Sequence, residues 1–315
     1  MADVKKIATR DGYAEGLIEL GAQRDDIIVL DADLAAATKT GAFKKVYPDS
    51  FYDCGIAEQN MIGIAAGIAA TGKTVFASSF AMFAAGRAFE QVRNSLGYTH
   101  LPVNIGATHA GISVGEDGAS HQCCEDIALM RTIPGMTIIN PADAVEAKAA
   151  TIAAAEIDGP VYLRFGRLAV PVIFDDGYKF EVGKGRVLVE GSDVTIIATG
   201  LMVERALAAA EQLKAEGINA RVINMATIKP LDNDIVLAAA RETGAIVTAE
   251  EHSVVGGLGA AVAELLSEQL PTPVLRVGVN DTFGESGPAV ELLEKYGLGV
   301  KDIVEKAKQA VSLKK

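Results

Sequence analysis

The sequence has no tryptophan, three cysteines and only 5% aromatic residues in 315. Cys123 and Cys124 are adjacent and Cys54 is alone, so neither a disulfide framework nor a zinc site built from paired C-x-x-C motifs can form. A reducing compartment, the cytoplasm, is the expected location. Basic residues are also scarce, with 29 Lys and Arg against 41 Asp and Glu and a net charge of −12. Nucleic acids and anionic membrane surfaces are therefore not expected as partners.

Long apolar segments are missing too. The longest weakly polar run, residues 61–71, is far shorter than the ~20 residues that span a bilayer. The N-terminal residues MADVKKIATRDGYAEGL lack the apolar stretch of a signal peptide. These features predict a soluble protein that does not enter a membrane.

Short apolar runs alternate with helical patterns along most of the chain. Strands are expected at 27–30, 75–77, 103–107, 136–139 and 161–165, and helices at 57–70, 84–96, 125–131 and 143–157. Apolar strands separated by helices are typical of a parallel sheet that is covered on both faces. The pattern predicts a three-layer α/β domain over residues 1–175.

Gly, Pro and charged residues interrupt this alternation at residues 176–192, which we predict to be a linker. Strands are then expected at 194–200, 220–225, 245–250 and 275–279, with helices at 202–216, at 232–243 and after residue 259. Residues 193–315 should therefore form a second three-layer α/β domain with a mostly parallel sheet.

Two glycine-rich segments resemble nucleotide-binding motifs. Residues 67–74, GIAATGKT, match the G-x-x-x-x-G-K-[ST] pattern, but a P-loop follows a strand and opens a helix. Here the expected helix comes first and the strand follows, so Gly72 is better interpreted as a helix terminator. The segment GGLG at 256–259 lacks the G-x-G-x-x-G spacing, and a helix that packs tightly on a strand explains it equally well.

Residues 108–122, THAGISVGEDGASHQ, follow an expected strand and contain His109, Glu116, Asp117 and His121. Ligands bind at the carboxyl ends of strands in open α/β sheets. Imidazole and carboxylate groups there suit proton transfer and hydroxyl recognition, although composition alone is equally consistent with a polar surface turn. The segment has no metal-ligand spacing, so a metal site is the less favoured function.

Glu58 opens the helix expected at 57–70, within the segment DCGIAEQN. A glutamate in the first helical turn often only complements the helix dipole. The neighbouring Ile56, Met61 and Ile62, however, predict a buried helix. In an apolar interior the pKa of Glu58 would rise, and the protonated form would donate a hydrogen bond.

Taken together, these segments resemble the later part of the transketolase family of thiamine diphosphate enzymes. The resemblance covers essentially the whole chain. It is carried by the segments ATRDGYAEGL (8–17), IVLDADL (28–34), DCGIAEQNM (53–61), SSFAMFAAGRAFEQVR (78–93), THAGISVGEDGASHQ (108–122), IPGMTIINPAD (133–143), TIIATG (195–200) and EEHSVVGGLG (250–259).

The resemblance implies a thiamine-diphosphate-binding fold and specific roles in cofactor binding. Glu58 matches the glutamate that hydrogen-bonds a ring nitrogen of the cofactor's aminopyrimidine and controls its tautomer. Phe80 and Phe83 match the aromatic pocket around the pyrimidine, and Asp33 matches an aspartate near the thiazolium ring.

The resemblance also implies substrate contacts. Asp117 and His121 match groups that bind donor-sugar hydroxyls and the reaction intermediate. Residues expected to hold the acceptor's phosphate are Arg10, His109 and Arg167, with Arg164 as the competing assignment for the last of these. The family serine of the phosphate site falls at Ala37, which leaves the acceptor open.

The family binds diphosphate and Mg²⁺ through a Gly-Asp-Gly motif, and this motif is missing from the 315 residues. The resemblance therefore implies that thiamine diphosphate, with Mg²⁺ or Ca²⁺, is shared with an N-terminal subunit that carries the metal ligands, in an assembly of two copies of each chain. The expected activity is transfer of a two-carbon ketol unit between phosphosugars in the pentose phosphate pathway.

Three alternatives remain open at this point. Deoxyxylulose-phosphate synthase and the beta subunits of 2-oxoacid dehydrogenases share the two-domain layout, and a non-catalytic scaffold is also consistent with a single subunit.

Overall fold

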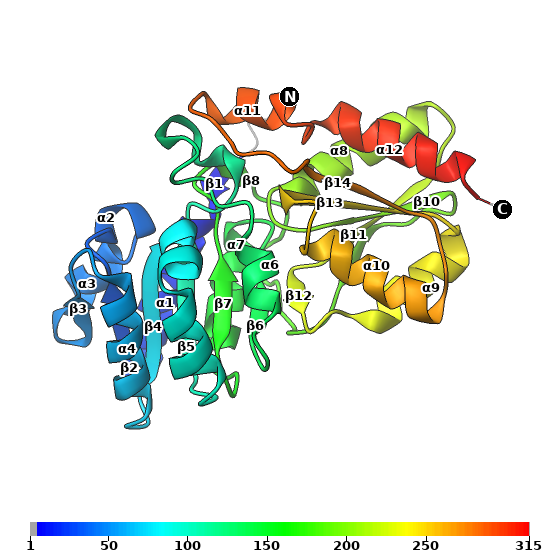
Figure 1. Cartoon of the computed structure of the whole chain (residues 1–315). Coiled ribbons are helices and arrows are strands. Elements are labelled where there is room, and N and C mark those ends of the chain that lie inside the picture. The colour runs from blue at the N-terminus through cyan, green and yellow to red at the C-terminus, as the bar shows by residue number, and fades with distance from the viewer. Residues whose placement is uncertain (1–4, 315) are drawn as a thin grey trace.

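The computed structural model describes residues 5–314, which form two α/β domains side by side (Figure 1). The first is built on a seven-stranded sheet of order β12-β6-β7-β5-β4-β2-β3, parallel throughout except where β12 pairs with β6. Its strands are β2 (Ile27–Asp31), β3 (Phe51–Asp53), β4 (Thr74–Phe80), β5 (Val103–Thr108), β6 (Thr137–Ile139), β7 (Val161–Arg164) and β12 (Thr227–Lys229). A separate antiparallel pair joins β1 (Lys6–Ala8) to β8 (Ala169–Pro171).

Helices cover both faces of this sheet, as the alternating pattern predicts. One face packs against α4 (Glu58–Ala69), α6 (Asp126–Arg131) and the helical segment that follows β4. The other face packs against α1 (Thr9–Gln23), α3 (Gly41–Val46) and α7 (Ala144–Ala154). The short helices α2 (Ala35–Thr38) and η1 (Pro48–Ser50) connect β2 to β3. Asp143 begins α7 by accepting the Glu146 N–H at 2.8 Å, an N-cap.

The helix expected at 84–96 is present in a different form. It consists of two π-helical turns, η2 (Met82–Arg87) and η3 (Val92–Gly97), on either side of the short α5 (Phe89–Gln91). Its buried residues include Ala84, Ala88, Val92 and Leu96, one every fourth position. A four-residue repeat is longer than the 3.6 residues of an α-helical turn, and wider π turns keep these side chains on the sheet.

The second domain is built on a five-stranded sheet of order β14-β13-β10-β11-β9. Its strands are β9 (Arg186–Val189), β10 (Val194–Ala198), β11 (Ala220–Asn224), β13 (Ile246–Ser253) and β14 (Val274–Val279). One face packs against α8 (Met202–Ala215), α11 (Ala289–Lys295) and α12 (Val300–Ser312), and the other against α9 (Asn233–Thr243) and α10 (Leu258–Gln269). The predicted class, two α/β domains with mostly parallel sheets, is confirmed.

Two strands join elements that the sequence pattern separates. β9 lies inside the predicted linker but pairs antiparallel with β11, so this part of the linker belongs to the second sheet. β12 follows β11 in the chain but pairs with β6 of the first sheet, with Thr227 opposite Ile139. Both pairings depend on contacts distant in sequence, which explains why local patterns did not predict them. The exact division at residues 175 and 193 stays a prediction.

The fold explains the P-loop-like motif at residues 67–74. Helix α4 ends at Ala69 and β4 starts at Thr74, so residues 67–74 run from helix to strand, opposite to a P-loop. Gly72 has φ +87°, the left-handed conformation expected just after a helix, although the cap residue itself is Ala70.

Among residues 5–314, no helix combines the length and apolar character needed to cross a bilayer.

Candidate functional site

The predicted site residues follow the carboxyl ends of neighbouring strands in the first sheet. Asp33 comes after β2, Glu58 after β3, His109 after β5 and Arg167 after β7, and Phe80 is the last residue of β4. These strands are parallel, so their carboxyl ends lie along one edge of the sheet. This edge is the usual ligand-binding edge of open α/β sheets.

Glu58 is buried, with 1% of its surface exposed, but its surroundings are not apolar as predicted. Its Oε1 accepts a hydrogen bond from the Ser79 hydroxyl at 3.0 Å, and its Oε2 lies 2.7 Å from Arg87 Nη1. Two polar side chains, Ser79 and Arg87, therefore hold this carboxyl group. The predicted buried helix is confirmed by Met61 and Ile62, both fully buried, whereas Ile56 is 78% exposed in the loop before the helix.

Arg87 is a site residue that sequence reasoning missed. It lies at the end of the π turn η2, and its guanidinium carbon lies 4.3 Å from the centroid of the Phe83 ring. Arg87 thus contacts the predicted acid and the predicted aromatic pocket at once. The available signal was a single arginine among apolar residues in AMFAAGRAF, but an α-helical spacing does not indicate that it reaches Glu58.

Four ring side chains form a wall beside this ion pair. The rings of Phe80 and Phe83 lie 5.8 Å apart and nearly parallel, at 15°. His109 stacks on Phe80 with centroids 3.8 Å apart, and His121 meets Phe83 edge-on at 5.3 Å. The structure therefore brings together residues from three predicted segments of the chain, 53–61, 78–93 and 108–122.

His109 is held as a neutral imidazole. Burial, together with nearby cations including Arg10, lowers its pKa to about 3. Nη1 of Arg10 lies 3.1 Å from Nε2 of His109 and also donates to the Ala37 carbonyl oxygen at 2.8 Å. Because arginine can only donate, Nε2 is the acceptor and Nδ1 carries the proton toward the Thr108 hydroxyl, 3.0 Å away.

The competing assignments Arg164 and Arg167 have different environments. The Arg164 side chain is 3% exposed and pairs with buried Asp126 through Nε at 2.8 Å and Nη2 at 3.2 Å. The Arg167 side chain is 38% exposed, donates to the Val114 carbonyl and pairs with Glu116 at 2.8 Å. Arg164 is thus fully engaged inside the fold, whereas Arg167 lies on the candidate site's surface.

Arg10 and Arg167 line a cavity of about 530 Å³. Ser113 and Glu116 of the 108–122 loop also line it, as do residues 288–291 of the second domain. Burial lowers the pKa of Arg10, and the nearby Arg167 lowers it further. The lining also includes the carboxylates of Glu116 and Glu291, so an anionic group would bind to Arg10 and, in place of Glu116, to Arg167.

Two predicted residues lie at the margin of this arrangement. Asp33 has φ +62°, and its N–H donates to Asp53 Oδ1 at 3.0 Å. The turn that carries it is held by buried Asp31, which accepts from the hydroxyls of Thr38 and Thr40 at 2.7 and 2.8 Å. Asp117 is exposed at the end of the helical turn η4 (Ile112–Asp117).

Comparison with known proteins agrees with this geometry. The transketolase pyrimidine binding domain matches residues 5–172, and the transketolase C-terminal domain matches residues 183–303. The chain belongs to the transketolase family. It is similar to a solved split gene transketolase described as an inactive beta4 tetramer, with TM-score 0.93, 56% identity and coverage of 98% of this chain and 100% of that one.

Two curated transketolase relatives differ in length. A 6-deoxy-6-sulfo-D-fructose transketolase subunit from Clostridium sp. is 46% identical over 97% of this chain and 95% of its own length. Human transketolase is 40% identical over 93% of this chain but only 47% of its own length. The chain therefore matches subunit-length transketolases end to end and about half of the human enzyme.

Transketolases depend on thiamine diphosphate, and the residues at the sheet edge fit its aminopyrimidine. Glu58, which pairs with Arg87 next to the Phe83 ring, provides an acceptor for the hydrogen-bonding edge of the pyrimidine. The nearly parallel rings of Phe80 and Phe83 provide an apolar contact for its faces. A metal ion is a different matter. In the part of the chain that the structure describes, no group of three or more His, Cys, Asp and Glu could hold one.

Proposed function

We propose that this chain is the C-terminal subunit of a split transketolase, which transfers a two-carbon ketol unit from a ketose phosphate to an aldose phosphate. The observation that carries the proposal lies at the carboxyl edge of the sheet, where the buried Glu58 pairs with Arg87 and Arg87 contacts the Phe83 ring that stacks with Phe80. Thiamine diphosphate supplies the carbanion stabilisation that ketose cleavage requires. Its pyrimidine would rest on this chain, in an assembly of two copies of each subunit.

The N-terminal subunit would provide the diphosphate site and the ligands of Mg²⁺ or Ca²⁺. Support comes from the end-to-end match to a transketolase subunit and from the half-length match to human transketolase. The described residues of this chain also offer no carboxylate or histidine cluster for the metal. Glu58 would accept a hydrogen bond from the aminopyrimidine, and Asp117 and His121 would bind donor hydroxyls.

The anionic end of the substrate would bind between Arg10 and Arg167 in the 530 Å³ cavity. His109 is neutral there, so it would contribute a hydrogen bond rather than charge. Ala37 supplies only its backbone carbonyl, which already accepts from Arg10. Without the family serine, a substrate with a different anionic group is a second candidate, such as the sulfonated ketose named for the Clostridium relative.

Reconstitution with the N-terminal subunit tests the proposal. The pair is mixed with thiamine diphosphate, Mg²⁺, xylulose 5-phosphate and ribose 5-phosphate, and the consumption of both sugars is followed. A parallel series replaces the donor with 6-deoxy-6-sulfofructose. The Glu58→Gln variant should lose activity by about 100-fold or more, while Glu211→Gln, a change on the exposed side of α8, should keep it. Full activity from this chain alone would refute the split site.

The rival functions give different outcomes in the same assay. Release of CO₂ from pyruvate by the pair would favour a deoxyxylulose-phosphate synthase or a 2-oxoacid dehydrogenase beta subunit. A non-catalytic scaffold predicts no cofactor uptake. Titrating the pair with thiamine diphosphate would then leave its thermal stability unchanged, since only a ligand of the native state raises it.

A further inference from the structure

The second domain packs closely under the loop that carries His109, Asp117 and His121. Gly111, Gly115 and Gly118 of this loop have φ values of +81°, +85° and +74°. A Cβ on Gly111 would lie 2.3 Å from the Glu251 carboxyl carbon, and one on Gly118 would lie 2.5 Å from Ser286 Oγ. At these two positions the loop therefore lacks a side chain where the second domain contacts it.

Glu251 is the central contact in this interface. It lies near the end of β13, is 3% exposed, and its Oε1 accepts the Ser113 N–H at 2.6 Å. Arg164 of the first domain donates to its backbone carbonyl at 2.9 Å. The Glu251 side chain thus crosses from the second domain to the loop's backbone.

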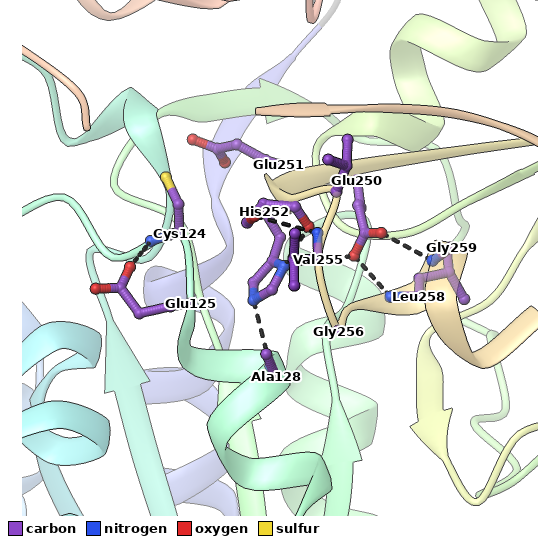
Figure 2. Close-up of polar contacts among 12 residues, drawn as sticks. Cys124, Glu125, Ala128, Glu250, Glu251, His252, Val255, Gly256, Leu258 and Gly259 are labelled. Atoms are coloured by element: carbon purple, nitrogen blue, oxygen red, sulfur yellow. Dashed lines mark hydrogen bonds and ion pairs between the residues drawn. The ribbon is translucent and has the colours of Figure 1, made fainter. Parts of the chain in front are cut away.

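The side chain of the neighbouring Glu250, unlike that of Glu251, makes its hydrogen bonds within its own domain. Figure 2 shows the two carboxylates of β13 pointing in opposite directions, with Glu250 directed at the start of α10. Its oxygens accept the N–H groups of Leu258 and Gly259 at 2.7 and 2.8 Å, so Glu250 caps this helix. Within the GGLG segment, position 257 requires glycine because a Cβ there would lie 2.0 Å from Glu250 Oε2.

A second contact holds the far end of the same loop. Gln122 Nε2 donates to the carbonyl oxygens of Ile112 and Glu285, at 3.1 and 2.9 Å. Ile112 belongs to the loop and Glu285 to the second domain. The loop is therefore fixed to the second domain at Ser113 and at Gln122, on both sides of the exposed Asp117.

Burial of a carboxylate is costly, and an apolar side chain would fill the same space at lower cost. Burial raises the pKa of Glu251 to about 7. The hydrogen bond that the Glu251 side chain makes is to the Ser113 N–H of the loop rather than to a group of its own domain. We propose that Glu251 is a positioning residue by which the second domain fixes the 108–122 loop for substrate binding. The role in substrate binding rests on the proposed function, whereas the effect on the loop does not.

Hydrogen exchange measured by mass spectrometry on the full chain tests the effect on the loop. Glu251→Asp withdraws the carboxyl group from the Ser113 amide and keeps the titratable group. Glu251→Gln replaces the acid but keeps an oxygen acceptor at the same distance from the backbone. We expect residues 111–122 to exchange about tenfold faster in Glu251→Asp, the factor that 1.4 kcal/mol gives. Helix α8 should be unchanged in Glu251→Asp, and Glu251→Gln should keep the wild-type loop rate.

Glu250→Gln is the matched control, since it alters the cap of α10 on the same strand. It should leave exchange in the loop at the wild-type rate. Unchanged loop exchange in Glu251→Asp would overturn the proposal. So would an increase shared equally by the loop and α8, because that result indicates general destabilisation.

Kinetics of the reconstituted pair provide the second readout. Glu251→Asp should lower kcat/KM for the ketose about tenfold, and Glu251→Gln should restore it to within about threefold. Wild-type kcat/KM in Glu251→Asp, with a loosened loop, would overturn the role in substrate binding. If the wild-type pair shows no ketol transfer, the proposed function fails while the exchange experiment still decides the loop's attachment.

Discussion

Replacing Arg164 and Arg167 separately should distinguish an arginine that holds the fold from one that binds substrate. In Arg164→Leu, the buried Asp126 loses its cation and two hydrogen bonds, at 2.8 and 3.2 Å. Removing one partner of a buried pair costs about 3–5 kcal/mol. Arg167 pairs with a 66% exposed Glu116, and such surface pairs contribute about 0–1 kcal/mol.

Urea denaturation of the two variants measures this difference. The free energy of unfolding should fall by about 3–5 kcal/mol in Arg164→Leu and by less than about 1 kcal/mol in Arg167→Leu. Adding Asp126→Asn to Arg164→Leu should recover part of the loss, because it removes the uncompensated charge. In the reconstituted pair, Arg167→Leu should raise the KM for phosphosugar about 10-fold to 100-fold. Equal losses of stability in both variants would refute the reasoning.

Three further predictions concern stability. Arg87→Leu should lower the free energy of unfolding by about 1–3 kcal/mol, because Glu58 stays buried without its cation. Thermal and urea denaturation measure this loss. A loss under about 0.5 kcal/mol would contradict the observed ion pair. Gly12→Ala should lower the free energy of unfolding by about 1–3 kcal/mol, since the added Cβ would lie 2.0 Å from the Ala144 carbonyl oxygen in α7. Gly63→Ala has free space around its Cβ and should raise the free energy of unfolding by about 0.5–1 kcal/mol. An unchanged free energy of unfolding in Gly12→Ala would show that α1 and α7 move apart to accept the methyl group. Glu251 keeps its proton to about pH 7 when folded but loses it near pH 4.5 when unfolded, so its contribution to stability falls as pH rises between these values. The wild type should therefore lose about 3 kcal/mol relative to Glu251→Gln from pH 4.5 to pH 7.5, and urea titrations that show a constant difference would exclude the raised pKa.

Local patterns in the sequence were sufficient for the fold class and for the placement of most candidate site residues at one edge of the first sheet. Short, mostly apolar runs such as 27–30 and 103–107, separated by helical patterns, are typical of buried strands that pair in parallel. Once the strands are parallel, residues that follow them share one edge. The order of helix and strand around residues 67–74 likewise excluded a P-loop without a structure.

Tertiary contacts determined the rest of the site. The ion-pair partner of Glu58 is Arg87, which lies at the end of a π turn 29 residues along the chain, and Ile56, one of the three apolar residues that suggested burial, is exposed. Whether Arg164 or Arg167 faces a ligand depends on Asp126, 38 residues from Arg164 along the chain. Strand β12 and the carboxylate of Glu251 enter the first domain from the second. A sequence pattern reports which face of its own segment is buried, but not which distant side chain completes that surface, and the polar partners of a buried charge come from such distant residues.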